Sequence, residues 1–393
     1  MNQSIISEMK KVLEIQKQLH IQEGPPSLQL RKDRLDRCIA MIKKYQEKII
    51  SSLQEDFGNR DPVMSMATEV ASAIGPLEYA KKHVSKWIKP EKRKAEIAPL
   101  GPLLGLMGAS ARIQYQPLGT IGCISPWNFP VNLVMAPLGG ILAAGNRAMI
   151  KPSEHTPSTS NITKKMFEEF FNQEEIAVFT GDPEVGAAFS SLPFDHLIFT
   201  GGTAIAKHVM KAASENLVPL TLELGGKSPV VVGKNSDISS AAIRVMQGKT
   251  MNAGQICLAP DYALVPKDKL DEFVKESVKA VSAMYPSLKD NDDYTSIINE
   301  KHFERIKSYL DDAKDKGAEL VEINPSDEDF SQQPHYKIPP TLVLNPSEDM
   351  KLMQEEIFGP VLPIKSYEKV EESVDFINTK ERPLGLYYFG NDK

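Results

Sequence analysis

Three polar residues of this 393-residue chain lie beside glycine or proline and carry side chains that could take part in catalysis. Cys257 in NAGQICLAP is expected in a turn at a domain edge, where the dipole of a starting helix would favour its nucleophilic thiolate. Glu223 in LELGG follows an apolar strand, and α/β proteins place ligands at the carboxyl ends of strands. Asn128 in PWNFP is held between two prolines, so its amide could act as a rigid hydrogen-bond donor. A small core cysteine and a solvated strand end remain the structural alternatives for Cys257 and Glu223.

Paired glycines mark a segment that could bind phosphate. FTGGTAIAK at residues 199–207 reads as a strand, then Gly201 and Gly202, then a helix whose free N–H groups could hold a phosphate. Thr203 and Ala206 replace the later glycines of G-x-G-x-x-G, so a plain strand–helix turn is the alternative. GGKS at residues 225–228 is not a Walker A loop, because Thr221 stands where its first glycine belongs. EEIFGP at residues 355–360 places a carboxylate and an aromatic ring in a turn, with a structural hairpin as the alternative.

The elements that must position these residues alternate between strand and helix from residue 112 onward. Short apolar runs such as TIGCI, RAMIK and HLIFT are separated by helical stretches, which is the signature of a doubly wound parallel sheet. A second series of strands and helices follows from SPVVVG to LGLYYFG, and residues 1–22, 28–57 and 63–88 read as helices. The predicted fold is therefore α/β, with a Rossmann-like domain in residues 1–224 and a second α/β domain in residues 225–393. Residues 91–111 read as a linker or a pair of irregular strands.

Composition and charge exclude several classes of protein. The hydrophobic fraction of 41% and the charged fraction of 25% are those of a globular, soluble protein. A net charge of −6 argues against a dedicated nucleic-acid binder. Three isolated cysteines and seven scattered histidines offer no metal spacing and no disulfide framework. No signal peptide and no run of about 18 apolar residues is found, so neither a membrane partner nor a metal is expected, and the expected location is the cytoplasm.

The strand expected in LGLYYFG ends close to the last residue of the chain, Lys393. A sheet strand makes an unusual terminus, so the sequence predicts that the second domain is incomplete at this end. An unpaired sheet edge and uncovered apolar surface would leave a chain of this length poorly active and prone to aggregate.

The order of the motifs resembles that of the aldehyde dehydrogenase superfamily. IGCISPWNFP, IKPSE, FTGGT, LELGGKSP, NAGQICLAP and EEIFGP follow one another, and 34 positions separate Glu223 from Cys257. The resemblance runs from about Leu28 to the last residue. The short N-terminal region, the APDY after the cysteine and the segment HVSKWIKPEKRK are similar to the class 3 branch, nearest to coniferyl aldehyde dehydrogenases.

This resemblance implies oxidation of an aldehyde to a carboxylic acid. Cys257 would attack the carbonyl to give a thiohemiacetal, and the Asn128 amide and the Cys257 backbone N–H would meet its oxyanion. After hydride transfer to the nicotinamide, Glu223 would act as the general base that activates water to hydrolyse the thioester. The branch implies an aromatic substrate, such as coniferaldehyde, or a medium-chain one, in a tunnel lined by Val131, Asn132, Met135 and Leu258.

The resemblance also implies NAD as the cofactor, with NADP as a second candidate. Lys151 and Glu154 of IKPSE would hold the adenosine ribose, and the Glu154 carboxylate would repel a 2′-phosphate. Glu356 would bind the nicotinamide ribose, with Phe358 near the ring, and Gly202 stands where many relatives have a serine. The implied cofactor-binding residues are Lys151, Glu154, Gly201, Gly202, Thr203, Leu224, Gly225, Glu356 and Phe358.

Two other functions stay open at this point. A cysteine esterase or acyltransferase without redox chemistry would need Cys257 but would have no use for IKPSE and EEIFGP. A catalytically silent relative would have no need of Cys257, Glu223 and Asn128 together. If the C-terminus is complete, the family also implies a homodimer, with residues 91–115 as a candidate oligomerisation excursion.

Overall fold

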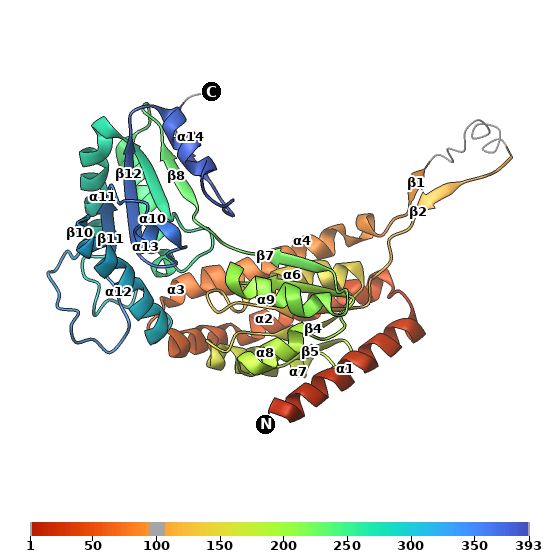
Figure 1. Cartoon of the computed structure of the whole chain (residues 1–393). Helices are drawn as coiled ribbons and strands as arrows, with labels where there is room; N and C mark the ends of the chain where they lie inside the picture. The colour runs from red at the N-terminus through yellow and green to blue at the C-terminus, as the bar shows by residue number, and fades with distance from the viewer. Residues whose placement is uncertain (1, 94–106, 392–393) are drawn as a thin grey trace.

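The computed structural model describes residues 2–93 and 107–391, which form two large β-sheets flanked by helices and a small two-stranded sheet (Figure 1). This arrangement confirms the predicted α/β class with a Rossmann-like parallel sheet and a second α/β unit. In the part of the chain that the structure describes, no helix has the length and apolar character needed to cross a membrane.

The first sheet is parallel throughout, and its strand order is β5-β4-β3-β6-β7. The order of connection reverses at the central strand β3, which lies between β4 and β6. In such sheets ligands bind outside the carboxyl ends of the strands at the point of reversal. The strand bounds are β3 (Thr120–Ile124), β4 (Arg147–Lys151), β5 (Ile176–Val178), β6 (His196–Thr200) and β7 (Leu220–Glu223).

Helices cover both faces of this sheet because its strands are apolar on both sides. Ala148 and Ile150 of β4 pack into one core, while Met149 between them packs into the core on the opposite face. The first core is closed by α2 (Leu28–Phe57), α4 (Ser72–Trp87), α6 (Asn132–Ala144) and α7 (Pro157–Phe170). The second is closed by α1 (Asn2–Glu23), α8 (Pro183–Ser190) and α9 (Thr203–Ser214).

The segment expected as one helix over residues 63–88 contains an irregular stretch. It comprises α3 (Pro62–Ser65), the π-helical segment η1 (Met66–Ala71) and α4. A π-helix is rare and is found most often next to functional sites. Here it carries a fully buried glutamate, Glu69.

The second sheet has the order β10-β11-β12-β9-β8-β13, with β10 antiparallel to β11 and the other pairs parallel. The strand predicted in LGLYYFG is confirmed, since β13 pairs with β8 at the edge of the sheet. The strands are β8 (Pro229–Val232), β9 (Tyr262–Pro266), β10 (Glu319–Glu322), β11 (Thr341–Leu344), β12 (Val361–Tyr367) and β13 (Tyr387–Phe389). The flanking elements are α10 (Ile238–Thr250), η2 (Met251–Gly254), η3 (Lys267–Lys269), α11 (Leu270–Met284), α12 (Glu300–Asp315), α13 (Lys351–Gln354) and α14 (Val370–Asn378).

The segment expected as a linker or a pair of irregular strands contains two short antiparallel strands. They are β1 (Glu91–Arg93) and β2 (Ala111–Ile113), and they lie away from the helical body in Figure 1. Residues 94–106 of this expectation lie outside the described residues.

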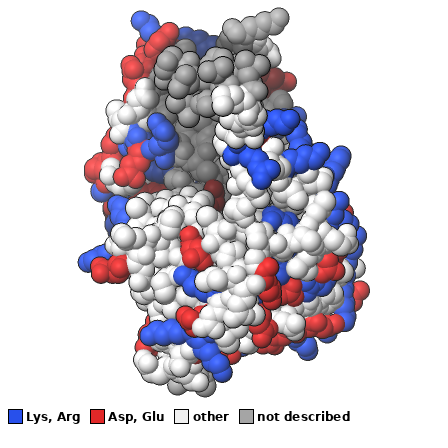
Figure 2. Space-filling view, turned by 90° about the vertical axis from the view of Figure 1, so that its right-hand side faces the viewer, with Lys and Arg blue, Asp and Glu red and all other residues white. Residues whose placement is uncertain are grey.

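Charged side chains are mixed on the face shown in Figure 2. Lysines and arginines alternate there with aspartates and glutamates among uncharged residues. Among the described residues, no group of three or more His, Cys, Asp or Glu side chains is arranged to hold a metal ion.

Candidate active site

The carboxyl ends of three neighbouring strands bring the predicted site residues to one edge of the first sheet. The loop with Asn128 follows β3, the paired glycines follow β6, and Glu223 is the last residue of β7. The backbone N–H of Gly201 donates to the carbonyl of Glu223 at 3.1 Å, which ties the β6 turn to the end of β7. The parallel order of the sheet therefore assembles this edge from segments far apart in sequence.

Cys257 lies in the turn between η2 and β9. The predicted turn is confirmed, but no helix starts at this residue, so the expected dipole is absent. Burial raises the pKa of the Cys257 thiol, as do the carboxylates of Glu223 and Glu356, while the backbone N–H groups of Cys257 and Leu258 lower it. The expectation of a favoured thiolate is therefore wrong, because burial first, and then the negative charges of Glu223 and Glu356, disfavour the charged form of the thiol. The charges of both carboxylates therefore act on this thiol.

The backbone before Cys257 is tightly wound. Asn252 and Ala253 have φ angles of 49° and 51°, in the left-handed region that residues other than glycine rarely adopt. Gly254 follows with φ of 73°, and a Cβ there would lie 2.3 Å from the carbonyl oxygen of Gly359. Only glycine fits this position, and the concentration of strain next to Cys257 is typical of a functional site.

The side chain of Asn128 is directed at this turn. Its Nδ2 donates to the backbone carbonyl of Gln255 at 3.1 Å, and the residue is buried. An amide has two N–H donors, so one remains for a ligand. The Gln255 side chain fixes the turn in its place, since it donates to the carbonyl of Ser296 and accepts from the N–H of Ile298, both at 3.0 Å. Sequence reasoning overlooked Gln255. The available signal was its polar side chain within the motif NAGQICLAP.

Glu223, at the end of β7, is exposed. The reason is topological: β7 is the edge strand of its sheet and pairs only with β6 among the described strands. The carboxylate is therefore accessible to water while it lies near the Cys257 thiol.

Glu356 is half-buried against the loop that leaves β7. A Cβ at Gly225 would lie 2.3 and 2.8 Å from the two carboxylate oxygens of Glu356, so a larger residue at 225 would displace this carboxylate. Burial raises the pKa of Glu356 to about 7, against the lowering by the Gly226 N–H and by Lys227 and Lys249. This contact joins the LELGG and EEIFGP motifs, which are more than a hundred residues apart.

Two buried lysines beneath Glu356 differ in their partners. Lys227 forms an ion pair with Asp261 and donates to the carbonyls of Leu352 at 2.7 Å and Glu355 at 2.9 Å. Lys249 is fully buried, and its Nζ has no hydrogen-bond partner among the described residues. Burial lowers the pKa of Lys249 from 10.5 to about 8.

Replacing Lys249 with methionine is expected to raise the thermal midpoint at pH 7. The folded-state pKa is lower than the unfolded value, so the buried ammonium costs stability, about 3 kcal/mol, at pH values below 8. The cost declines as the pH rises from 8 toward 10.5, so the gain from Lys249→Met should be smaller at pH 10. Calorimetry at both pH values measures this, with Lys227→Met as the matched control that should destabilise. Equal destabilisation by the two variants at pH 7 would contradict the prediction.

An aromatic group links the Asn128 loop with EEIFGP. The ring of Trp127 lies 5.4 Å from that of Phe358, edge to face, and 5.0 Å from the imidazole of His302 on α12. Phe358 has φ of 47°, a further strained position at this edge. Burial lowers the pKa of His302 to about 4, and its buried Nδ1 has no partner among the described residues. Neither Trp127 nor His302 was predicted as a site residue. His302 stands in no motif, so the sequence around it carries no signal of a role at this site.

Lys151 and Glu154 are adjacent at the end of β4. The buried Lys151 Nζ donates to the carbonyl of Pro152 at 2.8 Å and lies 3.4 Å from Glu154 Oε2. Burial lowers the pKa of Lys151, and Glu154 raises it. The lysine is thus engaged by the chain itself, while the Glu154 carboxylate is partly open to solvent.

The residues along this edge fit a dinucleotide. The first turn of α9 receives no hydrogen bond from an N-cap side chain, because the N-cap is Gly202, so backbone N–H groups there are free for an anion. A Cβ at Gly202 would meet no described atom within 4 Å, so the space beside these donors is open. Thr203 at the helix start is exposed, and Leu224 after β7 is half-buried. The unpartnered His302 Nδ1 and the Glu356 carboxylate provide polar groups further along the edge.

The expected substrate lining is partly wrong. Val131 and Met135 are fully buried in the core between α6 and the N-terminal helices, so they line no open tunnel in this structure. Both residues lie at the start of α6, on the side of the helix that is buried in the core. Sequence spacing alone did not distinguish this buried side of α6 from its outer side. Leu258 is 46% exposed and Asn132 is half-buried, so these two remain available to a ligand.

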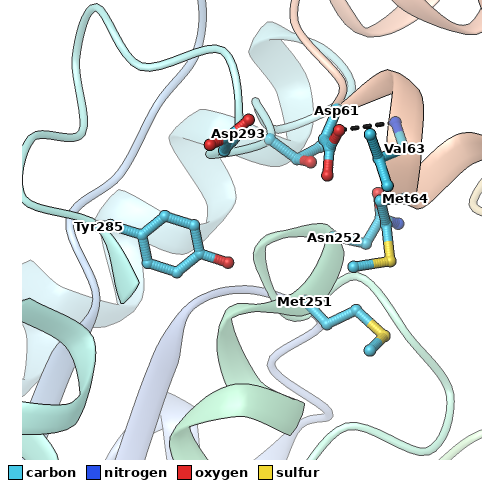
Figure 3. A pocket seen from close by; sticks show the side chains of 8 residues that line it. Asp61, Val63, Met64, Met251, Asn252, Tyr285 and Asp293 are labelled. Atoms are coloured by element: carbon cyan, nitrogen blue, oxygen red, sulfur yellow. Dashed lines mark hydrogen bonds between the residues drawn. The ribbon is translucent and has the colours of Figure 1, made fainter. Parts of the chain in front are cut away.

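A cavity of about 320 Å³ adjoins the strained turn before Cys257. Figure 3 shows carboxylate, phenol and thioether groups around it, contributed by α3 and by the second domain. It is lined by Asp61, Val63, Met64, Met251, Asn252, Tyr285, Asp293 and Thr295.

The site combines a strained turn that carries a thiol, an amide directed at this turn, two carboxylates and an open helix N-terminus at the edge of a Rossmann-like sheet. Together these groups are typical of an enzyme that oxidises aldehydes. Residues 23–393 match the family model described as "Aldehyde dehydrogenase family", and the chain belongs to this family. It is therefore an oxidoreductase that acts on aldehydes with a nicotinamide cofactor and produces the acid. A non-redox esterase or acyltransferase is not favoured.

Named relatives define the branch more closely. The chain is 58% identical to the "Probable coniferyl aldehyde dehydrogenase" of Caulobacter vibrioides, over 98% of this chain and 79% of that protein. It is 50% identical to the coniferyl aldehyde dehydrogenase of a Pseudomonas species, over 98% of this chain and 78% of the relative. The solved structure "Substrate bound state of Staphylococcus Aureus AldH" is 35% identical, with a TM-score of 0.89 over 98% of this chain and 81% of that one. The predicted resemblance, including its coniferyl branch, is confirmed.

Proposed function

We propose that this protein oxidises coniferaldehyde and similar aromatic aldehydes to their carboxylates. The observation that carries the site assignment is the meeting of Asn128 with the Cys257 turn at the Gln255 carbonyl. The names of the two most similar relatives described above support the aromatic substrate. A screen of NADH formation with coniferaldehyde, benzaldehyde, hexanal and acetaldehyde tests it, and the highest kcat/KM is expected for coniferaldehyde. A clear preference for acetaldehyde or hexanal would overturn the substrate assignment.

We propose Cys257 as the nucleophile and Asn128 as an oxyanion donor. The thiol must lose its proton before it attacks the carbonyl, because the thiolate is the nucleophilic form. The oxyanion of the resulting thiohemiacetal would accept from the free N–H of the Asn128 amide and from the Cys257 backbone. A bound nicotinamide supplies the hydride acceptor for this adduct. Glu223, exposed to water near the sulfur, would then activate the water that releases the acid.

We propose that the cofactor lies along the carboxyl edge of the first sheet. Gly201, Gly202 and Thr203 would present backbone N–H groups to the pyrophosphate. Lys151 and Glu154 would hold the adenosine ribose. The nicotinamide end would be held by Glu356, Phe358, Leu224 and Gly225.

NAD is expected to be the better cofactor, with a higher kcat/KM than NADP. Glu154 presents a partly exposed carboxylate that would repel a 2′-phosphate, and Lys151, which contacts the Pro152 carbonyl and Glu154, would offset this repulsion only in part. Steady-state kinetics with both cofactors measure the ratio, and Glu154→Gln should shift it toward NADP. A wild-type ratio that favours NADP tenfold, or about 1.4 kcal/mol, would refute the assignment.

We propose residues 1–224 and 225–393 as the two domains, with the boundary where the chain leaves β7 for β8 and passes from one sheet to the other. We also propose that the protein is a homodimer in the cytoplasm. The β1–β2 excursion would form part of the dimer contact. The position of β1 and β2 away from the helical body supports a role in contacts between subunits (Figure 1).

A further inference from the structure

A buried ion pair lies directly behind the loop that carries Asn128. Arg60, just after α2, and Glu69, in the π-helical segment η1, are both 0% exposed. The Arg60 Nη2 lies 3.0 Å from Glu69 Oε1. None of the motifs contains either residue, and the chemistry of the site described so far does not use them.

Both members of the pair hold the backbone of the Asn128 loop. Arg60 Nη1 donates to the carbonyl oxygen of Asn128 at 2.9 Å. Glu69 Oε2 accepts from the N–H of Val131 at 3.0 Å and from the N–H of Asn132 at 2.9 Å. The ion pair therefore contacts the loop at Asn128 itself and again where α6 begins.

Stability alone does not account for this ion pair. Removing two charges from water costs several kcal/mol, and apolar residues of similar volume often stabilise a protein as well or better. The Arg60 guanidinium packs 4.7 Å from the ring centre of Phe57 and 5.2 Å from that of Phe129, so apolar side chains could fill this space. Apolar residues could not donate to the Asn128 carbonyl or accept from the two N–H groups at the start of α6.

We propose that Arg60 and Glu69 are positioning residues that hold the Asn128 amide in place for the oxyanion of the reacting aldehyde. This inference rests on the proposed role of Asn128 as an oxyanion donor. The Asn128 carbonyl is held on one side by Arg60, and its amide reaches the Gln255 carbonyl in the Cys257 turn on the other. The residue thus links the ion pair to the nucleophile turn through its own backbone and side chain.

Glu69→Gln is the informative substitution because it keeps the shape of the side chain. The variant loses the negative charge and one of the acceptor oxygens, so the contacts to Arg60 and to both N–H groups cannot all persist. A displacement of about 1 Å at a reacting centre can cost about a hundredfold in rate. We expect a decrease of about tenfold or more in the rate of the NADH burst, with KM for the aldehyde changed less than threefold.

A double-mutant cycle with Asn128→Ala separates positioning from folding. Glu69→Gln, Asn128→Ala and the double variant are compared by the single-turnover rate of NADH formation, with thermal midpoints measured alongside. If Glu69 acts through Asn128, its substitution slows the wild-type enzyme but slows the Asn128→Ala enzyme by less than about twofold. An equal effect of Glu69→Gln in both backgrounds would overturn the proposal. An Asn128→Ala enzyme with normal burst rate would instead refute the oxyanion role on which the proposal rests.

Glu175→Gln provides a control for the loss of a partly buried glutamate–arginine ion pair elsewhere in the same domain. Glu175 precedes β5 at the amino end of the sheet, away from the site, and pairs with Arg34 at 2.9 Å and Arg37 at 2.8 Å. Its substitution should lower the thermal midpoint and leave the burst rate unchanged. Arg60→Lys adds a second test, since it keeps the charge beside Glu69 but loses the planar fork that reaches the Asn128 carbonyl. A normal burst rate in both Arg60→Lys and Glu69→Gln would also overturn the proposal.

Discussion

Replacing Cys257 with alanine is expected to abolish aldehyde oxidation, with a loss of at least about a thousandfold in kcat. The chain offers no second accessible thiol in its described part that could form the covalent adduct. Cys38 and Cys123 are fully buried, and burial raises the pKa of each to about 12. Steady-state NADH formation with an aromatic aldehyde, at saturating cofactor, measures the effect.

The other two cysteines serve as the controls for this prediction. Cys38→Ala and Cys123→Ala remove buried thiols that pack in the core, so they should change stability but leave kcat within a few-fold of the wild type. Mass spectrometry of trapped protein should find the acyl group on Cys257 alone. A Cys257→Ala enzyme that turns over near normally would refute the thiohemiacetal mechanism for this chain.

Replacing Glu223 with glutamine should give a stoichiometric burst of NADH followed by turnover about a hundredfold slower than normal. Acylation needs the thiol and the oxyanion donors, whereas hydrolysis of the thioester needs a base that can reach water. Glu223 lies near the sulfur and is exposed at the edge of its sheet, so it is suited to the second step. Stopped-flow measurement of NADH separates the burst from the steady state.

Glu356 is the matched comparison, since its carboxylate also faces Cys257. Glu356→Gln should weaken cofactor binding, seen as a raised KM for NAD, because Glu356 lies against Gly225 at the proposed nicotinamide end. Its acid release should remain fast once the cofactor is saturating. If Glu356→Gln shows the burst with slow turnover while Glu223→Gln does not, the roles of the two carboxylates must be exchanged. Loss of the burst itself in Glu223→Gln would mean that Glu223 acts earlier, on the thiol.

The elements of this fold were predictable because each one is encoded locally. The helix over residues 28–57 has the apolar spacing of an amphipathic helix, and the structure has the same bounds for α2. The strands from TIGCI to LTLE are short apolar runs between turn residues, and all occur as β3 to β7. The interruption at η1 was missed, because the buried residues Val70, Ala73 and Leu77 keep the spacing of three and four that is typical of an α-helix.

The residues of the site were predictable where they stand in recognisable motifs. Cys257, Glu223 and Asn128 stand in short segments whose glycines and prolines mark turns, so their identity could be read before any contact was known. Their electrostatics could not be read in this way. The raised pKa of Cys257 arises from burial first and then from carboxylates 34 and 99 positions away, and only the folded chain defines both.

The amino-acid sequence was sufficient for the order of elements, the family and the chemical groups at the site, since these depend on residue types and short spacings. The folded chain was needed for the environment of each group, since burial and pairing depend on segments that are distant in sequence. Arg60 and Glu69 come from the segment between α2 and α4, yet they hold the Asn128 loop. The side chains of Val131 and Met135 are buried in the core instead of being open to a ligand. Hydrogen bonds and desolvation act over a few ångströms, so they become defined when packing fixes which distant residues are neighbours.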